Sequence, residues 1–222
     1  MLGDELVIKD HHTERAKEII EILRDECADE AKFVVTVAGE SGSGKSELAT
    51  EIARLNRGND IPTGILQQDD YFVFPPKTNH AMRKKNIDQV GTYEVKLDFL
   101  DANLRSFKHG EKSIYKPLVD YDADKITTEV KEVGKFRSLI AEGTYTTSLR
   151  FSDFRIFIDR DYRQTYEDRK RRGRDKMEPF LEDVLKREHE IISTHKSLAD
   201  LVVTSDYQTV HLQNSNECDP YP

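Results

Sequence analysis

The sequence has only two cysteines and no long apolar run. Cys27 and Cys218 lie far apart and match no metal-binding spacing, which favours free thiols in a reducing compartment over a disulfide. No stretch approaches the roughly 20 apolar residues that a membrane-spanning helix requires. The charged N-terminus does not resemble the apolar core of a secretory signal. We therefore expect a cytoplasmic protein that makes no membrane contact.

An excess of positive charge is also missing. The 34 Lys and Arg residues are outnumbered by 42 Asp and Glu residues, and the formal net charge of −8 argues against a general nucleic-acid binder. The exception is a local basic cluster, RKRRGRDK, at residues 169–176. With 222 residues and no internal repeat, the chain is long enough for one substantial core and a small appended element.

Short apolar runs alternate with helical patterns along the chain. Residues 33–38 are β-branched and nearly all apolar, as in a strand buried on both faces of a parallel sheet. Strands are predicted at 33–38, 64–70, 136–143, 154–161 and 199–206, helices at 12–28, 46–54, 95–109, 165–172 and 179–197, and a hairpin or extended insertion at 114–133. No simple period organises residues 71–94. The alternation predicts an α/β fold, with a mostly parallel sheet flanked by helices and ligands at the carboxyl ends of the strands.

Residues 39–46, GESGSGKS, fit the P-loop pattern G-x-x-x-x-G-K-[ST] between a predicted strand and a predicted helix. The glycines allow backbone N–H groups to approach phosphate oxygens, and the following helix directs its N-terminus at the same anion. Lys45 supplies a charge for the β and γ phosphates, and Ser46 offers a hydroxyl to Mg²⁺. The predicted nucleotide-binding residues are Gly39, Glu40, Ser41, Gly42, Ser43, Gly44, Lys45, Ser46 and Glu47.

Acidic residues end two of the predicted strands. Asp69 and Asp70 follow one strand, where a carboxylate could deprotonate an attacking hydroxyl, although an acid pair in a solvated turn gives the same pattern. Glu142 ends another strand and is a candidate carboxylate on the Mg²⁺ or substrate side. No guanine-binding NKxD pattern is present, which argues against a GTPase.

The basic cluster is consistent with a lid at about residues 169–178. Arginines on a mobile lid can close over a nucleotide, exclude water and stabilise the transferring phosphoryl group. A solvated helix face or a nucleic-acid patch would have a similar composition. The P-loop in the same chain favours the lid.

The series GESGSGKSE, QQDDYF, NIDQVGTYEVKLD, KPLVDYD, IAEGTY, FIDRD, RRGRD and ADLVV resembles the uridine kinase and phosphoribulokinase family of P-loop kinases, in the family's order. The resemblance covers about residues 33–203. It implies that Asp69 is the general base for the substrate's primary hydroxyl, that Asp88 holds ribose hydroxyls, and that Glu142 lies near Mg²⁺. The implied catalytic arginines of the lid are Arg169, Arg172 and Arg174, with Lys45 acting on the phosphates, and the implied substrate-binding residues are Asp69, Tyr71, Asp88, Tyr121 and Glu142.

Two residues depart from the resemblance. Val119 stands where a uridine kinase usually has tyrosine, and Asp124 falls near the place of a base-contacting histidine. Valine donates no hydrogen bond and aspartate offers only acceptors, so the part of the pocket that would recognise a pyrimidine is altered. The QQDDYF segment also resembles nicotinamide riboside kinases.

These features predict a nucleoside-kinase-like P-loop domain at residues 32–212, a helical extension at 1–31 and a tail at 213–222. The expected activity is transfer of phosphate from ATP, with Mg²⁺, to a primary hydroxyl of a small molecule, most simply a nucleoside. A kinase for a sugar, sugar phosphate or vitamin, and a regulatory protein that binds ATP without transferring phosphate, are the alternatives. No nucleic-acid partner is expected, and the oligomeric state, a homo-oligomer included, is left open.

Overall fold

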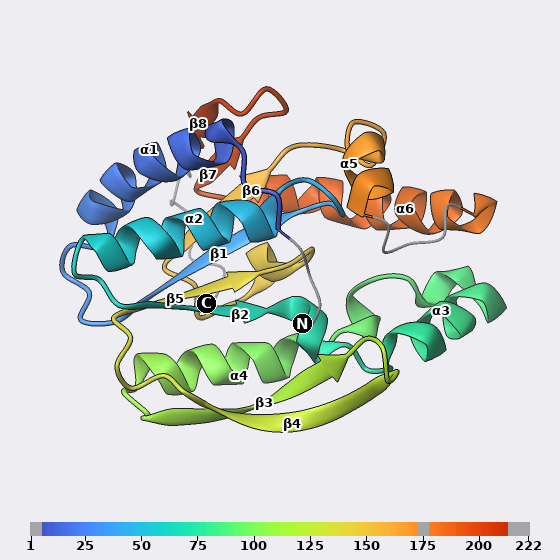
Figure 1. Ribbon diagram of the computed structural model, residues 1–222, viewed down its shortest axis with the longest axis horizontal. Helices are drawn as coiled ribbons and strands as arrows, with labels where there is room; N and C mark the ends of the chain where they lie inside the picture. The colour runs from blue at the N-terminus through green and yellow to red at the C-terminus, as the bar shows by residue number, and fades with distance from the viewer. Residues whose placement is uncertain (1–5, 173–177, 213–222) are drawn as a thin grey trace, which may run out of the picture.

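The computed structural model describes residues 6–172 and 178–212, with Arg172 described by its backbone alone. Within these residues the chain forms an α/β fold, in which a six-stranded sheet lies between layers of helices (Figure 1). The order of the strands across the sheet is β2-β5-β1-β6-β7-β8. The strands are β1 (Phe33–Gly39), β2 (Thr63–Gln67), β5 (Ser138–Glu142), β6 (Phe154–Ile158), β7 (Leu201–Val203) and β8 (Thr209–His211).

The sheet is parallel from β2 to β7, and β8 is added antiparallel to β7. The register brings the carboxyl ends of the central strands to the same end of the sheet. Glu142 at the end of β5 pairs with Val37 of β1 and with Gln67 of β2, and Gly39 at the end of β1 pairs with Ile158 of β6. The P-loop and the two predicted acidic segments therefore lie together at the carboxyl end of the sheet.

One face of the sheet is covered by α1 (Asp10–Glu26) and α2 (Lys45–Gly58) (Figure 1). Every residue of β1 is buried, and alternate side chains serve the two faces. Val35 and Val37 pack in the cluster that also holds Ile19 and Leu23 of α1 and Ile52 of α2. The N-terminal helix thus shares a core with the sheet and α2.

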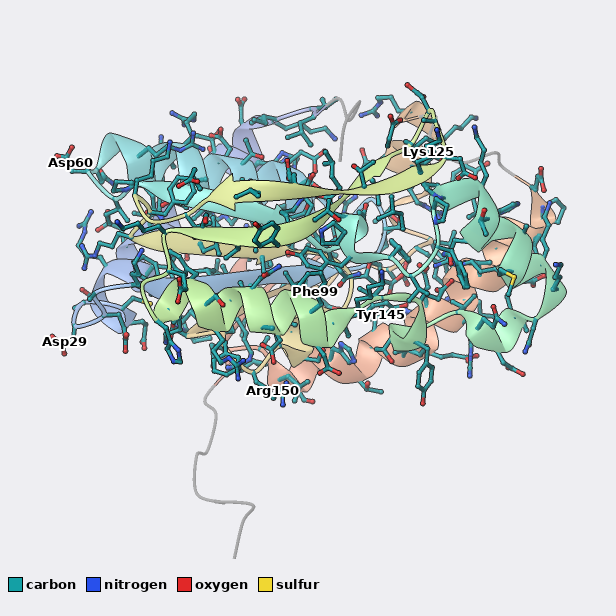
Figure 2. The ribbon with its side chains drawn as sticks, turned by 90° about the horizontal axis from the view of Figure 1, so that it is seen from below. Asp29, Asp60, Phe99, Lys125, Tyr145 and Arg150 are labelled. Carbon is teal, nitrogen blue, oxygen red and sulfur yellow. The ribbon has the colours of Figure 1, made fainter. Side chains whose placement is uncertain are left out.

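The opposite face is covered by α4 (Leu97–Lys108), and the hairpin of β3 (Ser113–Asp120) and β4 (Lys125–Glu132) lies beside α4 (Figures 1 and 2). Val34 of β1 packs here with Leu100, Leu104 and Phe107, which are spaced as one face of a helix. The hairpin is a separate two-stranded sheet.

Three helices lie at the end of the molecule where the central strands finish: α3 (Pro76–Lys85), α5 (Tyr166–Arg172) and α6 (Pro179–Ile192) (Figure 1). Figure 2 shows Lys125, at the turn of the hairpin, at the same end as α3, whereas Asp29 and Asp60 lie at the opposite end. Short 3-10 turns complete the connections: η1 (Gln68–Tyr71), η2 (Ile87–Gln89), η3 (Thr92–Glu94), η4 (Thr146–Ser148) and η5 (Ser193–Leu198).

The α/β architecture predicted from the sequence is confirmed, although several element bounds differ. Strand β2 ends at Gln67 rather than at residue 70, and α6 ends at Ile192 rather than at residue 197. Helix α2 continues to Gly58, past the predicted end at residue 54, because Leu55 still packs against the core and the turn forms at Asn59. Residues 71–94 contain α3, and β8 adds an edge strand that no pattern had indicated. Among the described helices, none is long and apolar enough to cross a membrane.

Candidate active site

The P-loop is held between elements that pack on it from two sides. Gly44 precedes α2 with φ 101°, and a Cβ there would lie 3.0 Å from both His12 Nε2 of α1 and Tyr207 Oη. A Cβ on Gly42, where φ is 77°, would lie 2.6 Å from Cγ of Arg169 in α5. Both positions therefore favour glycine for their conformation, and Gly42 favours it for space as well.

Polar contacts fix the rest of the loop. The Lys45 ammonium donates a hydrogen bond of 2.8 Å to the Glu40 carbonyl oxygen, and so spans the loop. The Glu40 carboxylate lies 2.5 Å from Nδ1 of His189 in α6, and the hydroxyl of Thr165 donates to the Ser41 carbonyl oxygen at 2.8 Å. The two remaining predicted members, Ser43 and Glu47, are both buried.

Ser46 and Glu142, the two predicted metal ligands, are in contact. The Ser46 hydroxyl donates to the Glu142 carboxylate at 3.1 Å, and the Glu142 residue is only 6% exposed. Burial, and secondarily the charge of Asp69, raise the pKa of Glu142 to about 7, against the opposing effects of Lys45 and Ser46. A nearby cation would stabilise the ionised form of a carboxylate held in this way.

The Ser46–Glu142 pair has the oxygen donors that Mg²⁺ prefers. Mg²⁺ in phosphoryl-transfer sites is usually bound through one or two carboxylates together with phosphate oxygens and water. In the part of the chain that the structure describes, no group of three or more His, Cys, Asp or Glu side chains is arranged to hold a metal. The pair therefore fits Mg²⁺ bound together with a nucleotide, rather than a metal site made by protein side chains alone.

Asp69 lies in η1, directly after β2, and lines a cavity of about 220 Å³. Its charge raises the pKa of Glu142, so the two carboxylates are close enough to interact electrostatically. Ser41 of the P-loop and Arg169 of α5 line the same cavity, as does Tyr121 of the hairpin turn. The structure thus brings a candidate base, a P-loop residue and a candidate lid arginine around one space.

The Asp70 carboxylate is held by other contacts and is not placed to act as the base. Its carboxylate accepts 2.8 Å and 3.1 Å hydrogen bonds from the Lys116 ammonium and the Val119 backbone N–H. Lys116 is itself buried and also contacts Glu129 at 2.8 Å. Asp70 therefore anchors the β3–β4 hairpin to η1, which places Val119 and Tyr121 along the cavity.

The structure describes only part of the predicted lid. Arg169 is buried, and its Nη2 donates to the Tyr162 carbonyl oxygen at 2.7 Å. Arg172 is the last residue of α5, and Arg174 lies outside the described residues. The roles of these three arginines in catalysis stay predictions.

Three residues singled out in the sequence are not brought to the cavity. Tyr71 is fully buried in the core, and its hydroxyl accepts a 2.9 Å hydrogen bond from Asn103. Its neighbour Phe72 lines the cavity instead. Asp88 lies on the exposed turn η2. Asp124 accepts a 2.7 Å hydrogen bond from the Lys77 backbone N–H in the first turn of α3, so it caps a helix.

Several cavity residues come from segments where sequence reasoning assigned no site. Asn79 and Arg83 of α3 and Glu188 of α6 also line the cavity. A usable signal was present for α3, because Pro76 occupies the first turn, where proline favours the start of a helix. Asn79 and Arg83 are then four residues apart and share one face of that helix.

The sequence is similar to a known family and to known kinases. The family model described as the phosphoribulokinase/uridine kinase family matches residues 34–210. A bifunctional alpha-galactosidase/sucrose kinase of Mediterraneibacter gnavus is 27% identical over 80% of this chain, although the match spans 20% of that longer protein. A uridine kinase of Latilactobacillus sakei is 27% identical over 78% of this chain and 85% of its own length.

A solved structure shares the fold. A possible uridine kinase from Bacillus stearothermophilus superposes with a TM-score of 0.62 at 19% identity, covering 87% of this chain and 97% of that one. The match of the family model over residues 34–210 includes the P-loop, Asp69, Glu142 and Arg169. The chain belongs to the phosphoribulokinase/uridine kinase family and is an ATP-dependent small-molecule kinase.

Proposed function

We propose that the protein transfers the γ-phosphoryl group of ATP to a hydroxyl of a small carbohydrate-like acceptor bound in the cavity beside Asp69. The observation that carries this proposal is the position of Asp69, which lines the cavity together with Ser41 of the P-loop and neighbours Glu142. A carboxylate there can accept the proton of an acceptor hydroxyl as it attacks the phosphorus.

The remaining residues would position and neutralise the phosphates. The P-loop N–H groups and Lys45 would hold the β and γ phosphates, and Arg169 would contact the transferring group from the α5 side. Ser46 and Glu142 would hold Mg²⁺, which when bound neutralises charge on the phosphate oxygens. The burial of Arg169 and of Glu142, which accepts a hydrogen bond from the Ser46 hydroxyl, supports this division of labour.

The carbohydrate-like acceptor is favoured over a pyrimidine nucleoside by what lines the cavity. Val119 offers no hydrogen bond to a base, Asp124 is engaged with α3, and Asp88 lies on an exposed turn. A sucrose kinase is among the relatives. The second candidate is a nucleoside, which the uridine kinase relative and the aromatic side chains of Phe72, Phe74 and Tyr121 in the cavity support.

Initial rates with an acceptor panel distinguish the two candidates. Fructose, sucrose, glycerol, uridine, cytidine and nicotinamide riboside would be compared at equal concentration by acceptor-dependent ADP formation. Each hydrogen-bond acceptor atom of the substrate that is buried without a donor costs about 1–3 kcal/mol. We therefore expect uridine and cytidine to be used about tenfold less efficiently than the best sugar. Faster turnover of uridine than of every sugar would establish the nucleoside candidate instead.

The ATP-binding part of the proposal is tested by Lys45→Ala. The substitution removes a charge-assisted contact to phosphate that typically contributes about 1.5–3 kcal/mol, so calorimetry should show ATP affinity falling by about 10- to 100-fold. The melting temperature without ligand should change little, because Lys45 is only half-buried. Lys17→Ala, at an exposed position of α1, is the matched control. Equal ATP affinity in both variants would contradict the assignment of the P-loop.

A further inference from the structure

Two hydroxyl groups from other parts of the chain donate to the backbone of the P-loop. The buried Thr165, directly before α5, donates to the Ser41 carbonyl oxygen at 2.8 Å. Tyr207, in the turn between β7 and β8, donates to the Ser43 carbonyl oxygen at 3.3 Å. Two distant segments therefore hold alternate peptide groups of the same loop.

Each of these peptide groups continues into a glycine with positive φ, 77° at Gly42 and 101° at Gly44. Glycine populates positive and negative φ about equally, so these residues alone would not fix the orientation of the peptide. All the peptide bonds that the structure describes are trans, and in a trans peptide the C=O and N–H groups point in opposite directions. A donor that holds the Ser43 carbonyl therefore directs the Gly44 N–H away from Tyr207. Thr165 directs the Gly42 N–H in the same way.

The Tyr207 side chain is held in place by an arginine. Nη1 of Arg160 donates to the Tyr207 hydroxyl oxygen at 2.8 Å, and Nη2 of Arg160 donates to the Asp168 carboxylate of α5 at 3.0 Å. Because Arg160 donates to the oxygen, the hydroxyl hydrogen is left for the P-loop carbonyl. The backbone of Tyr207 has φ 60°, which is uncommon for a bulky residue and costs conformational energy. Such a cost is consistent with a specific role for the side chain.

His12 of α1 also contacts the Tyr207 hydroxyl and leaves its hydrogen to the P-loop. Nε2 of His12 lies 3.4 Å from Tyr207 Oη, and Nδ1 accepts a 3.1 Å hydrogen bond from the Lys9 backbone N–H. Burial lowers the pKa of His12 to about 4, so the ring is neutral and, with Nδ1 as an acceptor, carries its proton on Nε2. That nitrogen is then a donor, to Tyr207 or to His11 Nε2 at 3.2 Å. Burial raises the pKa of Tyr207, so its hydroxyl stays protonated at neutral pH.

We propose that Tyr207 and Thr165 are positioning residues for ATP, and that each hydroxyl orients a glycine N–H of the P-loop toward the phosphates. This inference goes beyond the proposed function, because it concerns how the nucleotide is held and not the acceptor. Backbone N–H groups that already face the phosphates bind them without the cost of ordering the loop. Helix α1 takes part through His12, which secures the direction of the Tyr207 hydrogen bond.

Tyr207→Phe and Thr165→Val each remove one hydroxyl and nearly keep the shape of the side chain. From the net contribution of a hydrogen bond, we expect calorimetry to show ATP affinity falling about 3- to 10-fold in each variant. The KM for ATP should rise by a similar factor, with a smaller change in kcat and in the KM for the acceptor. A merely structural role would instead lower the melting temperature without ligand and leave ATP affinity unchanged.

The chain offers matched controls for both substitutions. Tyr93→Phe removes a hydroxyl from a residue that is 89% exposed. Thr127→Val removes a hydroxyl that donates to the Leu118 carbonyl oxygen within the hairpin, rather than to the P-loop. Both controls should bind ATP as the wild-type protein does. Thr165→Ser, which keeps the hydroxyl, should also bind ATP with nearly wild-type affinity.

Tripolyphosphate with Mg²⁺ is the second probe, because it carries the phosphates of ATP without the adenosine. We expect Tyr207→Phe and Thr165→Val to lose affinity for it by the same factors as for ATP. Weaker binding of ATP with unchanged binding of tripolyphosphate would show that Tyr207 acts on the adenosine, and would overturn the inference. ATP affinity equal to that of the controls in both variants would overturn it as well. Either result would leave intact the proposed function, which the acceptor panel tests separately.

Discussion

Asp69→Asn is expected to lower kcat by about 10²- to 10⁴-fold, because the amide keeps the shape of the side chain but cannot take the proton of the acceptor hydroxyl. Affinity for ATP should remain within a few fold of the wild-type value, since Asp69 lines the acceptor cavity and is not part of the P-loop. Steady-state kinetics and ATP titration by calorimetry measure the two quantities on the same preparation.

Asp70→Asn provides the contrast at the neighbouring residue. Asp70 forms a buried ion pair with Lys116, and breaking such a pair costs about 3–5 kcal/mol. The remaining Glu129 contact should reduce this cost. We expect a lower melting temperature and a higher KM for the acceptor, with a smaller effect on kcat than Asp69→Asn. Loss of turnover in Asp70→Asn with normal kcat in Asp69→Asn would contradict the assignment of the base.

Glu142→Gln is expected to change activity and stability in opposite directions. Loss of a carboxylate that would hold Mg²⁺ removes part of an interaction that contributes several kcal/mol to phosphoryl transfer, so turnover at limiting Mg²⁺ should fall by about 10²-fold. Without ligands at pH 8, the variant should be more stable than the wild-type protein, because it no longer buries an ionised carboxylate. Turnover against Mg²⁺ concentration and melting temperature against pH are the measurements.

The pH dependence of this stabilisation follows from the raised pKa of Glu142. Folding raises that pKa from 4.5 to about 7, chiefly through burial, so the folded protein binds the proton more tightly than the unfolded chain. The free energy of unfolding contributed by Glu142 is therefore highest below pH 4.5 and decreases as the pH rises through about 7. The gain in Glu142→Gln should be a few degrees at pH 8 and should vanish below about pH 4.5. An equal difference at both pH values would contradict the buried carboxylate.

The phosphate side of the site could be predicted from sequence because its determinants are local. The P-loop is one continuous segment between a strand and a helix, and Ser46 belongs to it. Glu142 ends a buried strand, and the parallel register places that end beside the P-loop. Residues fixed by strand ends and turns are the ones that periodicity and spacing describe well.

The acceptor side could not be predicted in the same way because it depends on tertiary contacts. Tyr71 and Phe72 are adjacent, and only the 3-10 turn after β2 decides which of the two enters the core and which lines the cavity. Asp124 lies on the hairpin turn, where its contact with α3 requires two segments 47 residues apart in sequence. Arg83 and Glu188 meet across two helices, a pairing that neither helix reveals alone.

We expect the site beside Asp69 to transfer phosphate from ATP to an acceptor hydroxyl. The most direct measurement is a single-turnover reaction with γ-labelled ATP and each panel acceptor, followed by chromatography and mass spectrometry of the products. Label should appear in a phosphorylated acceptor with the wild-type protein, and at a rate about 10²- to 10⁴-fold lower with Asp69→Asn. Label released only as inorganic phosphate, or transferred equally fast by Asp69→Asn, would contradict the claim.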